Sequence, residues 1–153
     1  MKRARIGMFA VAVLAMATVA FAQKPDFSGT WTLDPEASAM GQGGGQRMGG
    51  GMAAPMVVKQ TADTLTTETT RGENKVTMTY KLDGTESTNT GMGRGGVATE
   101  SKSMAKWDGT KLVITTKTGE NESVATWSLD GANLVIEGTG GRGPTKRVYK
   151  KTT

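Results

Sequence analysis

Three Asp-Gly pairs recur along the chain, at Asp83-Gly84, Asp108-Gly109 and Asp130-Gly131, each flanked by short alternating runs of apolar and polar residues. Such a pair between alternating segments is typical of a two-residue β-hairpin, because both central residues take positive φ at little cost. Repetition of the signal predicts an antiparallel meander whose strands run up and down through most of the chain. Closing the meander into a barrel would remove its exposed edges.

Short segments rich in Thr and Val, separated by polar breaks, favour strands over helices from residue 27 onward. Asp34-Pro35-Glu36 could begin a single helical turn with Asp34 as N-cap. The fold class is therefore all-β, an up-and-down antiparallel barrel of about 8–10 strands with little or no helix. Ten strands are expected, at Phe27–Leu33, Met56–Thr61, Thr64–Thr69, Lys75–Leu82, Thr85–Thr90, Val97–Trp107, Thr110–Lys117, Glu122–Leu129, Ala132–Glu137 and Thr145–Lys151.

The first 22 residues have the composition of a secretory signal peptide. Basic residues at positions 2, 3 and 5 precede an apolar stretch over 6–20, and Ala20-Phe21-Ala22 has the small-x-small form of a cleavage site. The apolar run is short for a membrane span and no second one follows, although an uncleaved anchor is the alternative. We therefore expect cleavage after Ala22, export to the periplasm or the exterior, and one domain over residues 23–153 without stable membrane insertion.

The charge and the missing residue types exclude several classes of function. Three of the 19 basic residues lie in the signal peptide, so 16 remain against 14 acidic residues, a net charge of +2 that gives no support to nucleic-acid binding. The chain has no histidine and no cysteine, which removes the usual general base, the thiol nucleophile, disulfides and thiolate metal sites. There is no GxSxG motif and nothing marks a catalytic pair of carboxylates. We expect no enzyme activity and no cofactor.

In an up-and-down meander, successive connections alternate between the two ends of the barrel. The tight connections 62–63, 83–84, 108–109 and 130–131 fall at one end, and the connections 34–55, 70–74, 91–96, 118–121 and 138–144 fall at the other. The first of these contains a flexible Gly/Met-rich loop, residues 35–55. One closed end and one flexible mouth is the layout of a ligand-binding barrel.

Four arginines, Arg47, Arg71, Arg94 and Arg142, lie in the connections of the mouth end. A ring of guanidinium groups there would steer an anion inward. The alternative is that Gly-Arg loops are simply solvated.

Period-two alternation assigns the inward faces of the strands. It directs Trp31 inward on the first strand, and Met78 and Tyr80 share the face of Val76 and Leu82. The inner face of Val97–Trp107 carries the small polar residues Thr99, Ser101 and Ser103, which predicts a cavity with hydroxyl groups unless this strand curls at an edge.

On the last strand Lys146 and Lys150 are expected to face solvent, which leaves Arg147 and Tyr149 pointing inward. A buried arginine needs an anionic partner. That partner is either an internal carboxylate or the carboxylate of a ligand, with the Tyr149 hydroxyl as a second donor.

PDFSGTWTLD (25–34) is similar to the Gly-x-Trp signature on the first strand of lipocalins and intracellular fatty-acid-binding proteins, and KRVYKK (146–151) is similar to the Arg-x-Tyr pair on the last strand of the fatty-acid-binding branch. Through these two motifs the chain resembles the calycin superfamily, which contains both groups. Small secreted bacterial lipocalin-like proteins beginning Phe-Ser-Gly-Thr-Trp are similar as well. The resemblance covers nearly all of residues 23–153.

The resemblance implies that Arg147 and Tyr149 grip a fatty-acid carboxylate inside the barrel. Thr126 or Trp127 stands where the second inward arginine of the family would fall, and residues 35–55 stand in place of its helical lid. We expect a monomer that binds a small hydrophobic, anionic, fatty-acid-like ligand, with Arg147, Tyr149, Trp31, Trp127, Met78 and Tyr80 as its contacts.

Two alternatives remain open from the residues alone. Met48, Met52 and Met56 recur at four-residue spacing, and thioethers are soft donors that suit copper(I) in the periplasm. Methionine and glycine could equally form a pliable apolar flap. The second alternative is a structural or interaction barrel without a ligand, filled by its own side chains.

Overall fold

The computed structural model describes residues 23–39, 54–92, 97–140 and 143–152, apart from the side chains of Arg71 and Met92. Within these residues it contains ten β-strands and no helix, which confirms the all-β prediction. The strands are β1 (Gly29–Ala39), β2 (Met56–Gln60), β3 (Thr64–Arg71), β4 (Asn74–Lys81), β5 (Glu86–Met92), β6 (Ala98–Asp108), β7 (Lys111–Thr118), β8 (Asn121–Asp130), β9 (Asn133–Thr139) and β10 (Thr145–Thr152). No helix in the described ranges has the length and apolar character needed to cross a membrane.

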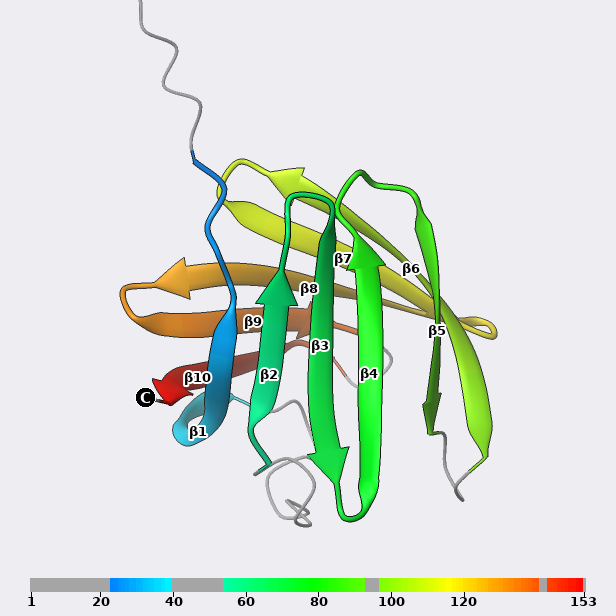
Figure 1. Cartoon of the computed structure of the whole chain (residues 1–153), viewed down its shortest axis with the longest axis horizontal. Helices are drawn as coiled ribbons and strands as arrows, with labels where there is room; N and C mark the ends of the chain where they lie inside the picture. Colours follow the sequence, from blue (N-terminus) through cyan, green and yellow to red (C-terminus); the bar gives the residue numbers. More distant parts are fainter. Residues whose placement is uncertain (1–22, 40–53, 93–96, 141–142, 153) are drawn as a thin grey trace, which may run out of the picture.

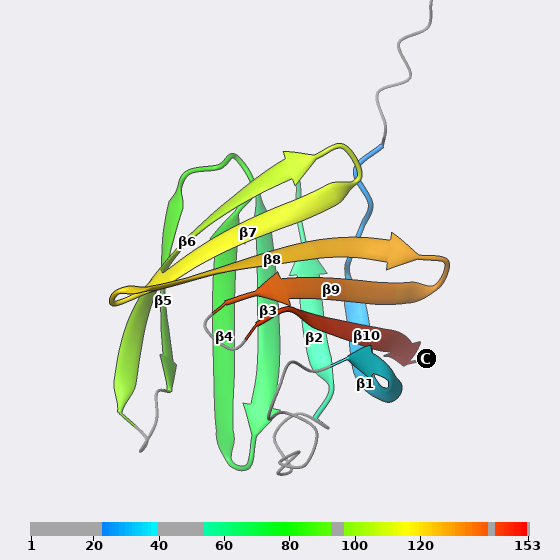
Figure 2. The same cartoon turned by 180° about the vertical axis from the view of Figure 1, so that it is seen from behind.

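All ten strands belong to one antiparallel sheet in the order β4-β3-β2-β1-β10-β9-β8-β7-β6-β5. The first and last strands of the chain pair with each other, from Thr30 opposite Thr152 to Asp34 opposite Val148. The sheet curls so that β2, β3 and β4 cross in front of β7 to β10 at a steep angle (Figure 1), and the view from behind shows the same two walls (Figure 2). The result is a nearly closed barrel.

The barrel is left open between β4 and β5, which are neighbours in sequence but share no backbone ladder. Side chains bridge the opening instead. The Asn89 amide accepts a hydrogen bond from Thr79 N at 2.7 Å and donates one to Thr79 O at 3.0 Å, so it replaces a backbone partner. Ser87 Oγ accepts one from Lys81 N at 2.9 Å. The prediction of a two-residue hairpin at Asp83-Gly84 is therefore wrong.

The turns differ from the prediction in one further respect. No described residue other than glycine has positive φ, so the aspartates of the Asp-Gly pairs do not take it. Asp108 pairs with Lys111, and Asp130 pairs with Asn133, so each aspartate ends its strand and glycine takes the first central position of the turn. Gly109 and Gly131 adopt φ of 59° and 60° there, the position that a type II′ turn reserves for glycine. Asp83 acts differently, since its Oδ1 accepts hydrogen bonds from both Thr85 N and Thr85 Oγ1.

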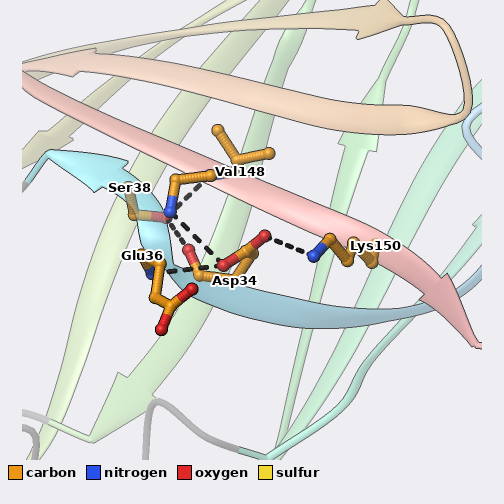
Figure 3. Close-up of polar contacts among 6 residues, drawn as sticks. Asp34, Glu36, Ser38, Val148 and Lys150 are labelled. Carbon is orange, nitrogen blue, oxygen red and sulfur yellow. Dashed lines mark hydrogen bonds and ion pairs between the residues drawn. The ribbon is translucent and has the colours of Figure 1, made fainter.

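The last part of β1 leaves the regular ladder. Asp34 pairs with Val148 and Ala39 pairs with Lys146, so the stretch of β1 between these pairs is longer than the stretch of β10 that it faces. Figure 3 shows how polar groups hold this excursion: Asp34 Oδ1 accepts from Glu36 N, Ser38 Oγ accepts from Val148 N, and Lys150 Nζ lies 2.7 Å from Asp34 Oδ2. The Lys150 ammonium and the neighbouring N–H groups hold the pKa of Asp34 below its usual value. The Asp34 carboxylate thus makes the predicted cap contacts, but the predicted helical turn is absent and residues 35–39 belong to β1 rather than to the loop.

The packed core fills the end of the barrel that carries the tight turns. Phe27 is fully buried, with its ring stacked on Trp107 at 5.9 Å and edge-on to Trp127 at 5.8 Å. Gln60, at the end of β2, fixes the segment before β1, since its Oε1 accepts from Phe27 N and its Nε2 donates to Pro25 O, both at 3.0 Å. We call this part of the barrel the closed half.

Gly29 belongs to the same region. A Cβ at this position would lie 2.7 Å from Lys151 Cε, whose chain crosses it, and Lys151 Nζ lies 5.6 Å from the centre of the Trp31 ring. The glycine of the Gly-x-Trp motif therefore makes room for a cation that covers the tryptophan.

Candidate functional site

An internal cavity of about 270 Å³ occupies the other half of the barrel, which we call the hollow half. It lies between the wall formed by β2 to β5 and the wall formed by β7 to β10. Its lining residues are Met56, Thr67, Thr69, Val76, Met78, Tyr80, Gly91, Ile114, Thr116, Ala125, Trp127, Ile136, Arg147 and Tyr149.

Five of the six residues expected to contact a ligand line this cavity: Arg147, Tyr149, Trp127, Met78 and Tyr80. The alternation of inward and outward residues brought them together, since they come from β4, β8 and β10. Their role in binding stays a prediction.

Trp31 is the exception. Its side chain is buried in the closed half, and its indole N–H donates to Phe27 O at 2.9 Å. The inward direction was predicted correctly, but a position on β1 near the tight turns places the ring in the packed core rather than in the cavity.

Arg147 gives the cavity its charge. It points inward from β10 and is half-buried, and its Nε is inaccessible to solvent and has no hydrogen-bond partner among the described residues. All 14 acidic side chains of the chain lie in the described ranges, and their ion pairs with lysines lie on the outside of the barrel. No side-chain carboxylate pairs with Arg147, so the internal partner considered from the sequence is not present in this structure.

Two tyrosines share the cavity with Arg147. Burial raises the pKa of Tyr80 above its usual value, and the nearby positive charge of Arg147 opposes the rise. The Tyr80 hydroxyl donates to Met78 Sδ at 3.3 Å, a weak acceptor. Tyr149 is 8% exposed. The Tyr80 hydroxyl is therefore a neutral donor that can serve an anion placed against the guanidinium, and Tyr149 lines the same cavity.

Three threonine hydroxyl groups in the cavity wall were not predicted. Thr67 and Thr69 lie on β3 and Thr116 on β7. Alternation starting from the buried Leu65 would have identified the two β3 threonines.

The predicted serines of β6 do point inward, but they do not line the cavity. Ser101 Oγ donates to Asn89 O at 3.4 Å, and Ser103 Oγ lies 2.9 Å from Thr116 Oγ1. Both hydroxyls are used within the wall.

Several sequence predictions fall outside the described residues. Arg47, Arg94 and Arg142 lie there, as does the side chain of Arg71, so the arginine ring at the mouth stays a prediction. Met48 and Met52 also lie outside, whereas Met56 is buried and lines the cavity. Within the described ranges, no three His, Cys, Asp or Glu side chains gather as metal ligands would.

A groove of about 510 Å³ lies between the ends of β8, β9 and β10. Thr126, Glu137 and Lys146 stand side by side across it on the outward faces of the three strands. Glu137 and Lys146 are exposed and the surface is mixed in charge, so the groove offers an anion less than the internal cavity does.

Comparison with known proteins supports the architecture. No family model matches the sequence, and no curated protein matches it. Solved structures do match: the REP1-NXSQ fatty acid transporter has a TM-score of 0.63 at 16% identity, over 82% of this chain and 96% of that one. Human cRBP IV has a TM-score of 0.60 at 21% identity, over 84% of this chain and 99% of that one. The chain therefore has a calycin-like fold, a nearly closed ten-stranded antiparallel barrel, as the resemblance of its first and last strands implied.

Proposed function

We propose that this protein is an exported binding protein for a small apolar anion, such as a fatty-acid-like carboxylate, held in the internal cavity. The observation that carries the proposal is Arg147, a cation in an apolar cavity that no carboxylate side chain of the chain neutralises. A buried charge without a partner is costly, and a ligand carboxylate would supply that partner together with hydrogen-bond acceptors.

The remaining lining residues support an amphipathic ligand. Met56, Ile114, Ile136 and Trp127 provide apolar surface for an alkyl chain, which gains about 0.8 kcal/mol per methylene group on burial. Tyr149 and Tyr80 line the same cavity, and a tyrosine hydroxyl can donate a hydrogen bond to a carboxylate. Two proteins with this fold are named as a fatty acid transporter and as cRBP IV, and both names denote transport or binding rather than catalysis.

The test is calorimetric titration of the protein with decanoate, beside the variant Arg147→Met. Losing a hydrogen bond to a charged group costs about 1.5–3 kcal/mol, so we expect the variant to bind about 10- to 150-fold more weakly. In the wild type, 1-decanol should bind more weakly than decanoate for the same reason.

Lys146→Met is the matched control. Lys146 is the neighbouring residue on β10, carries the same charge, and faces outward. Unchanged binding in this variant would separate the internal site from general attraction of anions. Equal losses in both variants would contradict the proposed site, and a loss confined to Lys146→Met would move binding to the outer groove.

We also propose that residues 1–22 are removed on export and that the mature chain is a monomer. The support for removal is the basic start, the short apolar run and the small residues before Gln23. N-terminal sequencing of the protein recovered from the periplasm or the medium should begin at Gln23. A chain retained in the membrane with Met1 in place would contradict it.

A further inference from the structure

Toward the closed half, the cavity is bounded by fully buried side chains that do not line it. Its lining residues nearest the closed half each face a leucine on the adjacent strand that is fully buried and does not line the cavity. These pairs are Trp127 with Leu112, Tyr149 with Leu134, and Tyr80 with Leu65. Behind them Phe27 fills the closed half. An alkyl chain therefore has no path toward the tight turns.

The volume of the cavity sets the size of the ligand portion that the described walls can enclose. A cavity of about 150 Å³ holds one benzene ring, which corresponds to about 25 Å³ per non-hydrogen atom. On that scale the cavity of about 270 Å³ accommodates about eleven non-hydrogen atoms. Octanoate has about ten and decanoate about twelve, whereas hexadecanoate has about eighteen and would need about 450 Å³.

We propose that the cavity selects medium-chain carboxylates of about eight to ten carbons over long-chain ones, an inference that rests on the proposed function and names its ligand class more narrowly. The carboxylate pairs with Arg147, and the tail fills the space bounded by Met56, Ile114 and Trp127. A longer tail leaves the cavity toward the mouth and gains no further burial against the described walls.

The experiment is a series of titrations with hexanoate, octanoate, decanoate, dodecanoate, tetradecanoate and hexadecanoate, each kept below its micellar concentration. Affinity should rise about fourfold per added methylene, equivalent to about 0.8 kcal/mol, up to about ten carbons. Beyond that length it should stay flat or fall. A rise that continues through hexadecanoate overturns the length limit and leaves the proposed function standing. No binding at any length overturns both.

Two variants test whether the cavity walls set the chain length at which affinity stops rising. Ala125 lines the cavity, so Ala125→Leu should move the limit down by about three carbons. Gly91→Ala is the gentler change, since Gly91 lacks positive φ and an added Cβ would lie 3.4 Å from the flexible end of Met78. It should shorten the limit by about one carbon even if Ala125→Leu folds poorly.

Lys146→Met serves again as the control and should leave the series unchanged. A limit that does not move in either cavity variant, in folded protein, would show that the lining does not determine it and would overturn the inference.

Discussion

The two halves of the barrel interior are built by the same strands and differ in how completely they are filled. In the closed half, Phe27, Leu65, Leu112 and Leu134 are fully excluded from solvent. In the hollow half β3, β7 and β9 carry Thr67, Ile114 and Ile136 around a cavity of about 270 Å³, which Arg147 of β10 also lines. A single strand contributes to both: β3 supplies Leu65 to the core and Thr67 to the cavity.

This difference separates stability from binding. Close-packed apolar side chains contribute most of the free energy of folding, whereas an unpaired buried cation lowers it. The closed half can therefore compensate for a hollow half that is poorly packed and charged. Substitutions in one half should change the free energy of unfolding, and substitutions in the other should change ligand affinity.

The largest effect is expected for Phe27→Ala. Truncating a fully buried aromatic side chain costs about 3–5 kcal/mol of the free energy of unfolding. Urea unfolding should show this loss, while titration of the folded variant with decanoate should give wild-type affinity. A small loss of stability, or a changed affinity, would mean that the two halves are not independent.

Asn89→Ala is expected to have the next largest effect, about 1–3 kcal/mol, because it removes both hydrogen bonds that join β5 to the backbone of Thr79. Hydrogen exchange should speed up at Thr79 N. Ser87→Ala, which removes one bond to Lys81 N, is the matched control and should cost about half as much. Equal exchange at Thr79 in wild type and Asn89→Ala would show that water replaces the bridge without loss.

Arg147→Met should leave the free energy of unfolding unchanged or raise it by about 1 kcal/mol, because it removes a half-buried charge whose Nε is buried and has no hydrogen-bond partner among the described residues. Urea unfolding without ligand measures this, in the same variant whose decanoate binding should be weakened. A loss of stability above about 1 kcal/mol would reveal a structural role for the guanidinium.

The smallest effect concerns the pH dependence of stability at Tyr80. Burial raises the pKa of its hydroxyl above the ordinary 10.0, so the unfolded chain ionises first as the pH rises. The stabilising contribution of the neutral side chain is complete below pH 10.0 and is lost as the pH rises through the folded-state pKa. Relative to Tyr80→Phe, the wild type should therefore lose stability in urea unfolding as the pH rises above 10.0. Parallel pH profiles would contradict the shift.

Much of this architecture was predictable from local patterns. The ten strands follow from period-two alternation with turn residues between them, and their bounds agree with the structure to within a few residues except at the end of β1. The inward direction of Arg147 and Tyr149 follows from the exposed Lys146 and Lys150 beside them. Ligand binding at the cavity stays a prediction, and so does the arginine ring at the mouth, because Arg47, Arg94 and Arg142 lie outside the described residues.

Other features depend on contacts between distant residues and could not be predicted in this way. The Asp83-Gly84 pair has the same local sequence as Asp108-Gly109, yet only the latter joins paired strands. Trp31 and Trp127 both point inward, but Trp31 packs in the closed half and Trp127 lines the cavity. Height along the barrel axis distinguishes them, and the alternation of a strand carries no information about that height.

The sequence by itself determined which side chains face the interior, because the alternation of a strand is a local property of its backbone. Only the tertiary structure decided which part of that interior is filled. That outcome depends on how strands far apart in the chain come together, and no single segment encodes the arrangement. The same contacts decide whether Arg147 meets a carboxylate and whether an aromatic ring such as that of Phe27 fills a given part of the interior.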